Sequence, residues 1–114
     1  MRFLIALTLL AAPAVADTYD GRYFWRGGDP VTACDPDVYN DGSITIDGPQ
    51  ISFIESSCQL TKPTALRDMP EGTLFDAICS GEGDTWTERM MVYKTFDGVA
   101  VISRGAVRTY TRCQ

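Results

Sequence analysis

The sequence predicts an all-β domain: a small antiparallel barrel or sandwich of about seven strands, stapled by two disulfides. Three observations lead to this prediction. Short β-favouring segments alternate with turn signals, no segment has a sustained helical repeat of apolar residues, and the 114-residue chain contains four cysteines. A closed barrel would also hide the strand edges of so small a domain, because unpaired edges promote aggregation.

The start of the chain has the pattern of a signal peptide. Arg2 supplies a positive charge, residues 3–12 are apolar, and Ala14 and Ala16 are the small residues of a cleavage site. We expect residues 1–16 to be removed and residues 17–114 to form a single β domain, periplasmic or secreted. The apolar run is short for a bilayer and no later segment approaches it, so we expect no membrane span.

Each strand is predicted from β-favouring residues bounded by turn signals. Asp47–Gly48 and Asp97–Gly98 suit tight hairpin turns, because such turns need residues that tolerate positive φ. Residues 31–42 are expected to form a loop, and residues 63–69 a single helical turn with Pro63 near its start. The expected strands cover residues 19–26, 43–47, 51–60, 73–79, 86–96, 99–104 and 106–112.

The expected core consists of large apolar residues on these segments. They are Tyr23, Trp25, Ile44, Ile46, Ile51, Phe53, Leu74, Ile78, Trp86, Val92, Val101 and Tyr110.

The four cysteines are expected to form structural disulfides. No two of Cys34, Cys58, Cys79 and Cys113 form a C-x-x-C pair, which argues against a thioredoxin-like redox site and a four-cysteine zinc site. Cys58 and Cys79 lie near the ends of successive strands, and a barrel brings its first and last strands together. These placements favour Cys58–Cys79 with Cys34–Cys113. A register shift would favour Cys34–Cys58 with Cys79–Cys113, so that alternative stays open.

Composition excludes several classes of function. The formal net charge of −5 argues against a nucleic-acid partner, because phosphate binding needs a surplus of Lys and Arg. The chain has no histidine, which removes Ser-His-Asp catalysis and histidine-liganded metals. The segment 35–42 contains three aspartates, but its acidic residues and glycine do not have the spacing of an EF-hand calcium loop. We therefore expect no catalytic residues, no metal and no cofactor, and a carboxylate-based hydrolase is the least favoured alternative.

One short segment is a candidate interaction loop. Ser80, Gly81, Glu82, Gly83 and Asp84 form an acidic, glycine-containing turn between two expected strands. The two acidic residues would repel a phosphate, so the segment is not expected to bind one. It is expected to be either a simple hairpin turn or a rigid loop that meets a partner.

Three segments resemble a group of small exported four-cysteine proteins of alphaproteobacteria. They are residues 54–61 around Cys58, residues 79–86 with the pattern C-x-G-E-G-x-x-W, and residues 109–113 ending in Y-x-R-C. The resemblance implies a bacterial periplasmic or secreted β protein. A fainter likeness, through the serine–glycine loop near a cysteine, is to small periplasmic barrels that inhibit lysozyme. The chain departs from those inhibitors after Gly83 and lacks a second matching loop, so no site residue is carried over.

These observations favour an exported, non-enzymatic domain, monomeric, that binds a protein or small ligand or has a structural role in the cell envelope. One alternative is an inhibitor of an envelope hydrolase such as lysozyme, acting through residues 80–84. The other is a barrel that binds a small apolar ligand in a cavity lined by Trp25, Phe53, Trp86 and Tyr110.

Overall fold

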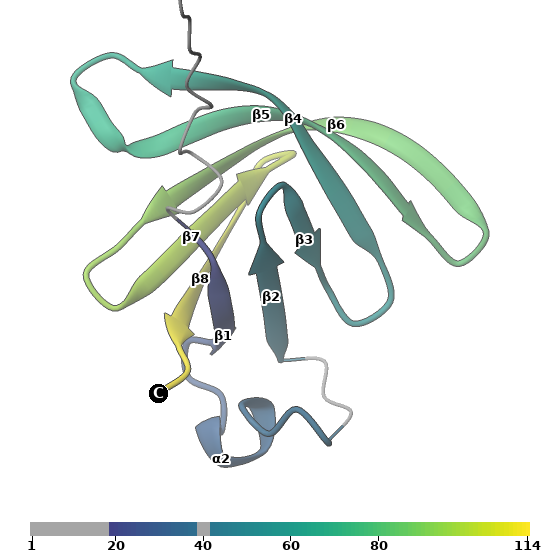
Figure 1. The fold of residues 1–114 in the computed structure, drawn as a ribbon, viewed down its shortest axis with the longest axis vertical. Helices are drawn as coiled ribbons and strands as arrows, with labels where there is room; N and C mark the ends of the chain where they lie inside the picture. Colours follow the sequence, from purple (N-terminus) through teal and green to yellow (C-terminus); the bar gives the residue numbers. More distant parts are fainter. Residues whose placement is uncertain (1–18, 39–41) are drawn as a thin grey trace, which may run out of the picture.

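The structure, a computed structural model, describes residues 19–38 and 42–114. Within them the chain forms a closed antiparallel barrel in which each strand pairs with its neighbours in sequence and β1 closes against β8 (Figure 1). The all-β class is confirmed, with eight strands where about seven were expected. The predicted cleavage after Ala16 lies outside the described residues. The strands are β1 (Gly21–Trp25), β2 (Ser43–Asp47), β3 (Gln50–Ser52), β4 (Ser57–Leu66), β5 (Met69–Gly81), β6 (Asp84–Lys94), β7 (Gly98–Ser103) and β8 (Ala106–Arg112).

The additional strand arises because the expected strand over residues 51–60 is two strands. The chain reverses between β3 and β4, and the Phe53 amide donates a 2.8 Å hydrogen bond to the Ser56 carbonyl. Glycine and proline, the usual turn signals, are absent from residues 53–56, so no sequence signal marks this reversal.

The predicted helical turn over residues 63–69 is wrong. β4 continues to Leu66 and β5 begins at Met69, with Asp68 at φ 61° in the turn between them. Lys62 has φ 52°, and the β4–β5 register shifts between Thr61 and Thr64. This bulge accommodates Pro63, which has no amide hydrogen to donate to a ladder.

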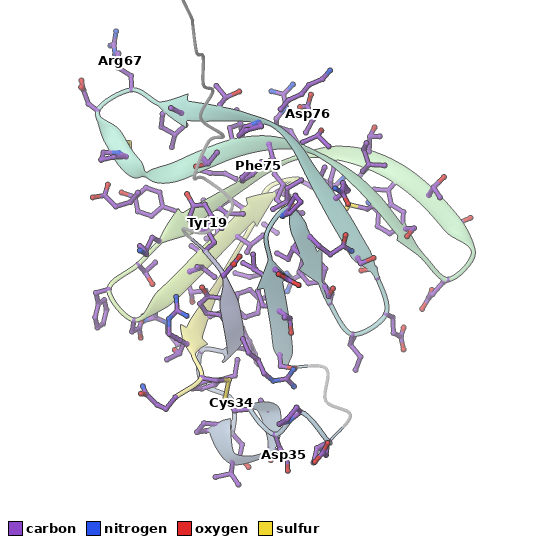
Figure 2. All side chains as sticks on the ribbon, viewed as in Figure 1. Tyr19, Cys34, Asp35, Arg67, Phe75 and Asp76 are labelled. Carbon is purple, nitrogen blue, oxygen red and sulfur yellow. A yellow bond between two sulfur atoms is a disulfide. The ribbon has the colours of Figure 1, made fainter. Side chains whose placement is uncertain are left out.

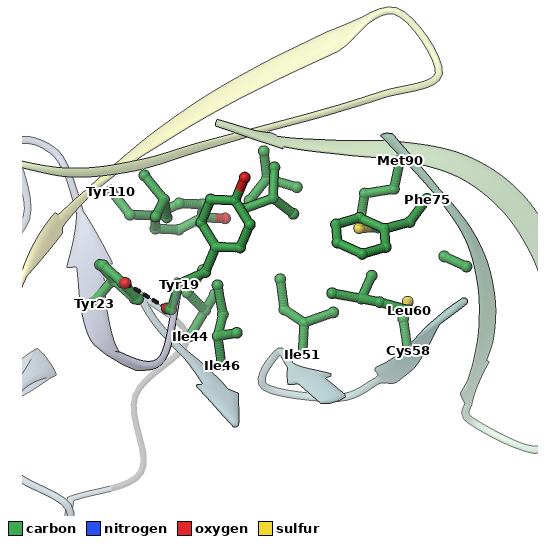
Figure 3. Close-up of a cluster of buried hydrophobic side chains, with 14 of the residues drawn as sticks. Tyr19, Tyr23, Ile44, Ile46, Ile51, Cys58, Leu60, Phe75, Met90 and Tyr110 are labelled. Carbon is green, nitrogen blue, oxygen red and sulfur yellow. Dashed lines mark hydrogen bonds between the residues drawn. The ribbon is translucent and has the colours of Figure 1, made fainter. Parts of the chain in front are cut away.

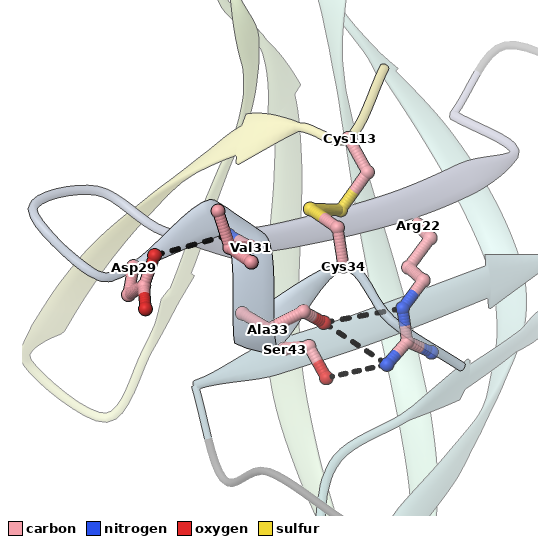
Figure 4. Close-up of a disulfide and its surroundings, with 7 residues drawn as sticks. All are labelled: Arg22, Asp29, Val31, Ala33, Cys34, Ser43 and Cys113. Atoms are coloured by element: carbon pink, nitrogen blue, oxygen red, sulfur yellow. Dashed lines mark hydrogen bonds between the residues drawn. A yellow bond between two sulfur atoms is a disulfide. The ribbon is translucent and has the colours of Figure 1, made fainter. Parts of the chain in front are cut away.

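The start of the predicted loop over residues 31–42 belongs to a short helix, α2 (Pro30–Ala33). The Asp29 side chain caps it by accepting a 3.0 Å hydrogen bond from the Val31 amide (Figure 4). Arg22 on β1 donates from both Nε and Nη2 to the Ala33 carbonyl, at 3.3 and 3.0 Å. An Asp N-cap followed by proline is a helix-start signal that the loop prediction missed.

Two disulfides hold the barrel, in the pairing that the strand order favoured. Cys34, just after α2, is bonded to Cys113 after β8 (Figure 4). Cys58 and Cys79 face each other directly across β4 and β5, with their Cα atoms 4.0 Å apart. Such bonds are typical of proteins that mature in an oxidising compartment.

Side chains on the inward face of the strands fill the barrel (Figure 3). Seven of the expected core residues are buried, and they are Tyr23, Ile44, Ile46, Ile51, Val92, Val101 and Tyr110. Further buried residues, outside the expected core, are Tyr19, Leu60, Phe75, Ala77, Met90 and Val99.

The set of β5 side chains expected to point into the barrel is wrong by one residue. Ile78 is 53% exposed and Leu74 is only partly buried, whereas Phe75 and Ala77 are buried. Cys79 must face inward to reach Cys58, and the two-residue period of a strand then turns Ala77 and Phe75 inward as well. Figure 2 shows Asp76 on the outside of β5, next to the inward-facing Phe75.

Three further expected core residues lie near the barrel rim. Trp25 at the end of β1 is 56% exposed. Phe53 and Trp86 are partly buried and pack against the edge of the core. All three lie beyond the filled centre of the barrel.

One end of the barrel is closed by tyrosines. Tyr19 is 2% exposed, and its hydroxyl lies 2.9 Å from Oγ1 of Thr73 and donates to the Glu71 carbonyl at 3.1 Å. Tyr23 donates its hydroxyl to the Tyr19 carbonyl, and Arg112 donates to the Tyr23 hydroxyl at 3.0 Å. The opposite end carries the candidate site.

Candidate functional site

The candidate site is a hollow at the open end of the barrel, which we call the mouth hollow. It has a volume of about 260 Å³ and lies between the β3–β4 turn, the β5–β6 hairpin and the β7–β8 hairpin. Phe53, Trp86 and Tyr110 supply aromatic walls, and the buried side chains of Met90 and Val101 also line it.

Strand periodicity brings these side chains together. Val92 and Met90 are buried in the barrel, so Glu88 and Trp86 continue the same inward face of β6 toward the open end. On β8, Tyr110 is buried and Arg108 follows two positions nearer the β7–β8 turn. Glu88 and Arg108 therefore line the mouth hollow. Glu88 is not among the expected core residues, but counting back in twos from Val92 places it on the inward face of β6.

Glu88 is the carboxylate of the mouth hollow, and only 11% of its side chain is exposed. Its Oε2 accepts a 3.1 Å hydrogen bond from the indole Nε1 of Trp86. Its Oε1 lies 3.5 Å from Nε of Arg104, in the β7–β8 turn. The carboxylate thus holds an aromatic wall and the neighbouring turn in position.

The sulfur atoms of Cys58 and Cys79 lie near the Glu88 carboxylate, and the three ligand atoms fall within 4.8 Å of one another. Both sulfurs belong to a disulfide, however, and the cysteine ligand of a metal is the free thiolate. The arrangement is therefore a disulfide packed against a carboxylate and cannot act as a metal site while the disulfide is intact.

Arg108 is the cation of the mouth hollow. Within residues 19–38 and 42–114 its guanidinium forms no hydrogen bond or ion pair. Burial raises the pKa of the neighbouring Tyr110 above its ordinary value of 10.0, and the charge of Arg108 partly offsets this rise. An arginine without a partner at the edge of an aromatic hollow is available to bind an anionic group.

A second hollow, the side hollow, adjoins the first. It has a volume of about 250 Å³ and is lined by Trp25, Gly42, Arg108 and Tyr110, of which the last two also line the mouth hollow. The four aromatic residues expected around a ligand cavity thus line two hollows that share Arg108 and Tyr110.

The expected interaction loop lies beside the mouth hollow. Gly81 and Asp84 are the last paired residues of β5 and β6, and Glu82 (φ 52°) and Gly83 (φ 84°) make a two-residue turn. A Cβ on Gly81 would lie 2.6 Å from the Glu55 carbonyl oxygen, so glycine allows the hairpin to contact the β3–β4 turn.

An outer hollow of about 350 Å³ lies between this hairpin tip and the β3–β4 turn. Phe53 and Trp86 line both it and the mouth hollow, whereas Glu82 and Asp84 line only the outer hollow. The open end of the barrel therefore combines aromatic surface with an acidic hairpin on one side and Arg108 on β8.

No protein-family model, curated protein or solved structure matches this chain. Over the described residues, no helix is long and apolar enough to cross a membrane.

Proposed function

We propose that this protein is an exported, non-enzymatic binding domain of the cell envelope that holds a small amphipathic ligand in the mouth hollow. The observation that carries the proposal is a hollow with three aromatic walls and an arginine, Arg108, that has no partner in the described chain. The leader pattern of residues 1–16 and the two disulfides support export.

The lining indicates what kind of ligand would fit. Phe53, Trp86 and Tyr110 favour a flat or apolar body, because aromatic side chains pack well against rings and chains. Arg108 favours an anionic group at the edge of that body. Ligand pockets usually have volumes of roughly 300–1,000 Å³, so a hollow of about 260 Å³ suits a small molecule.

The chemistry of the lining also supports a binding role over catalysis. Glu88 is the single carboxylate that lines the mouth hollow, whereas carboxylate-based glycoside hydrolysis uses two at a set separation. Glu88 is already engaged by Trp86 and Arg104. The whole chain lacks histidine, the most frequent general base.

Fluorescence can test this proposal, because the two tryptophans of the chain both line the hollows. The probe is 8-anilino-1-naphthalenesulfonate, an aromatic anion. We expect saturable binding with energy transfer from tryptophan, weakened about tenfold by Arg108→Gln through loss of a charged hydrogen bond.

The matched control is Arg89→Gln, which removes an exposed arginine paired to Asp76 on the outer face of the barrel. This variant should bind the probe like the wild type. Equal binding by wild type, Arg108→Gln and Arg89→Gln, or no saturable binding at all, would contradict the proposal.

A second candidate function is inhibition of an envelope hydrolase such as lysozyme. The observation that favours it is the β5–β6 hairpin, which extends away from the rest of the barrel and ends in a tight acidic turn (Figure 1). This function predicts that lysozyme is inhibited and that replacing Glu82 and Asp84 by Ser abolishes inhibition without unfolding the domain. Unchanged lysozyme activity at excess protein would eliminate lysozyme as the target.

A further inference from the structure

More than half of β6 is paired on only one side. Asp84–Tyr93 pairs with β5, but only Met91–Lys94 pairs with β7. In the described part of the chain, no strand pairs with residues 84–90 on the β7 side. Figure 1 shows this part of the β5–β6 hairpin diverging from β7 and β8.

The register identifies the backbone groups that point to the open side. Gly81 and Asp84 flank a two-residue turn and form its hydrogen-bonded pair, so Trp86, two residues further along, also bonds to β5. Thr85 and Thr87 lie between these bonded positions, and their N–H and C=O groups therefore point away from β5. Both residues are exposed.

The free edge of β4 provides a contrast. Beyond its pairing with β3, that edge has Lys62 at positive φ and then Pro63, and a bulge with a proline is a common means of blocking strand addition. The sequence Asp84-Thr85-Trp86-Thr87 has no proline and no residue of positive φ. The β6 edge thus retains the geometry needed to pair with another strand.

We propose that the free edge of β6 binds an extended segment of another protein, one that carries an aromatic residue two positions from a Lys or Arg. The partner strand would hydrogen-bond to Thr85 and Thr87. Strand addition to an exposed sheet edge gains affinity from main-chain hydrogen bonds and specificity from alternate side chains.

The side chains on the inward face of β6 specify this pattern. Trp86 lies on the inward face of β6 between Thr85 and Thr87, so an apolar side chain on the same face of the partner strand could pack beside it. Asp84, two positions away, is exposed and forms no ion pair in the described chain, so it favours a basic neighbour. Glu88 is already paired with Arg104, so it does not require a basic residue of the partner strand opposite it. The net charge of −5 also favours a basic partner.

This inference does not depend on the small-ligand proposal. A small molecule in the mouth hollow would contact side chains alone, whereas the partner strand would also hydrogen-bond to the backbone of Thr85 and Thr87. Each proposal can fail while the other holds.

The experiment uses a heptapeptide, acetylated Thr-Lys-Thr-Phe-Thr-Lys-Thr amide, titrated into the oxidised ¹⁵N-labelled protein. We expect the amide signals of Thr85 and Thr87 to shift and their hydrogen exchange to slow by about tenfold at saturation. The same peptide with alternate amides N-methylated keeps its side chains but cannot pair as a strand, and it should not bind. A peptide with Glu in place of Lys should bind more weakly.

Three variants test the edge. Thr87→Pro removes an amide that points to the open side and spares the β5–β6 ladder, whereas Thr87→Val keeps that amide. We expect Thr87→Pro to abolish binding and Thr87→Val to retain it, and Asp84→Lys to weaken binding with the edge intact.

Several results would overturn the proposal. They are equal binding of the N-methylated peptide, unchanged Thr85 and Thr87 signals at millimolar peptide, and concentration-dependent shifts of these signals without peptide. The last would assign the edge to a second copy of this chain.

Discussion

The indole nitrogen of Trp86 donates a 3.1 Å hydrogen bond to the carboxylate of Glu88, two residues further along β6. Both side chains lie on the inward face of the strand, and the same carboxylate is near Arg104 in the β7–β8 turn. One nearly buried carboxylate therefore orients an aromatic wall of the mouth hollow and links it to the adjacent hairpin.

Replacement of Glu88 should loosen this wall. Glu88→Ala leaves the Trp86 indole N–H without its acceptor, and we expect the free energy of unfolding to fall by about 1–3 kcal/mol. Glu88→Gln keeps an acceptor of the same shape and should lower the free energy of unfolding by less. Denaturant titration monitored by far-UV circular dichroism gives both values. Equal losses for the two variants would argue against the role assigned to this hydrogen bond.

Loss of either disulfide should destabilise the barrel strongly. Loop-closure entropy gives about 3.4 kcal/mol for Cys58–Cys79 and about 4.5 kcal/mol for Cys34–Cys113. Cys58 and Cys79 are also buried, so replacing both with Ala adds a packing cost that the partly exposed Cys34 and Cys113 do not incur. Thermal melts of the two double variants measure the losses. A melting point unchanged by either pair would contradict the expectation.

Gly98, at the start of β7, should not tolerate a side chain. A Cβ there would lie 1.9 Å from the Tyr110 carbonyl oxygen on β8, so Gly98→Ala must push apart two paired strands. We expect a loss of about 3 kcal/mol or more, or failure to fold. The control is Gly83→Asn, because a Cβ at Gly83 meets nothing within 4 Å and Asn tolerates positive φ. Similar stability of the two variants would contradict this account of β7–β8 packing.

The domain should lose stability in alkaline solution. Burial raises the pKa values of Tyr19, Tyr23 and Tyr110 above the ordinary 10.0, because the folded state favours the neutral phenol. The stability that these neutral tyrosines contribute is fully present below pH 10. It is lost as the pH rises through their raised pKa values. Melting points should fall above pH 10, and the native protein should ionise part of its tyrosine at higher pH than the denatured protein. Superimposable phenol titrations of the two states would exclude this source of pH dependence.

Much of the fold follows from sequence patterns with a direct physical cause. Ser43–Asp47 and Ala106–Arg112 were predicted with the bounds that the structure has, because Gly42 and Gly105 mark where the two segments begin. Strand order and barrel closure favoured the disulfide pairing that the structure has, although a register shift left one alternative open. The turn at residues 53–56 could not be predicted, because no glycine or proline marks it and its geometry depends on packing against Gly81.

The site was harder to predict because it depends on where the filled core ends. Trp25, Phe53 and Trp86 have the composition of core residues, and only the three-dimensional arrangement places them at the rim. The inward-pointing side chains of β5 could have been predicted from the disulfide alone, because Cys79 must share a face of the strand with Ala77 and not with Ile78. The free edge of β6 arises from a mismatch in strand length, since β6 extends past the β7–β8 turn.

The central claim is that the open end of the barrel binds a small amphipathic ligand, and chemical-shift mapping of bound 8-anilino-1-naphthalenesulfonate tests it most directly. The account predicts saturable shifts concentrated at Phe53, Trp86, Glu88, Arg108 and Tyr110, with the tyrosine-closed end around Tyr19 and Thr73 unchanged. Shifts spread over the surface, or gathered at the Tyr19 end with Arg108 and Trp86 unaffected, would contradict it.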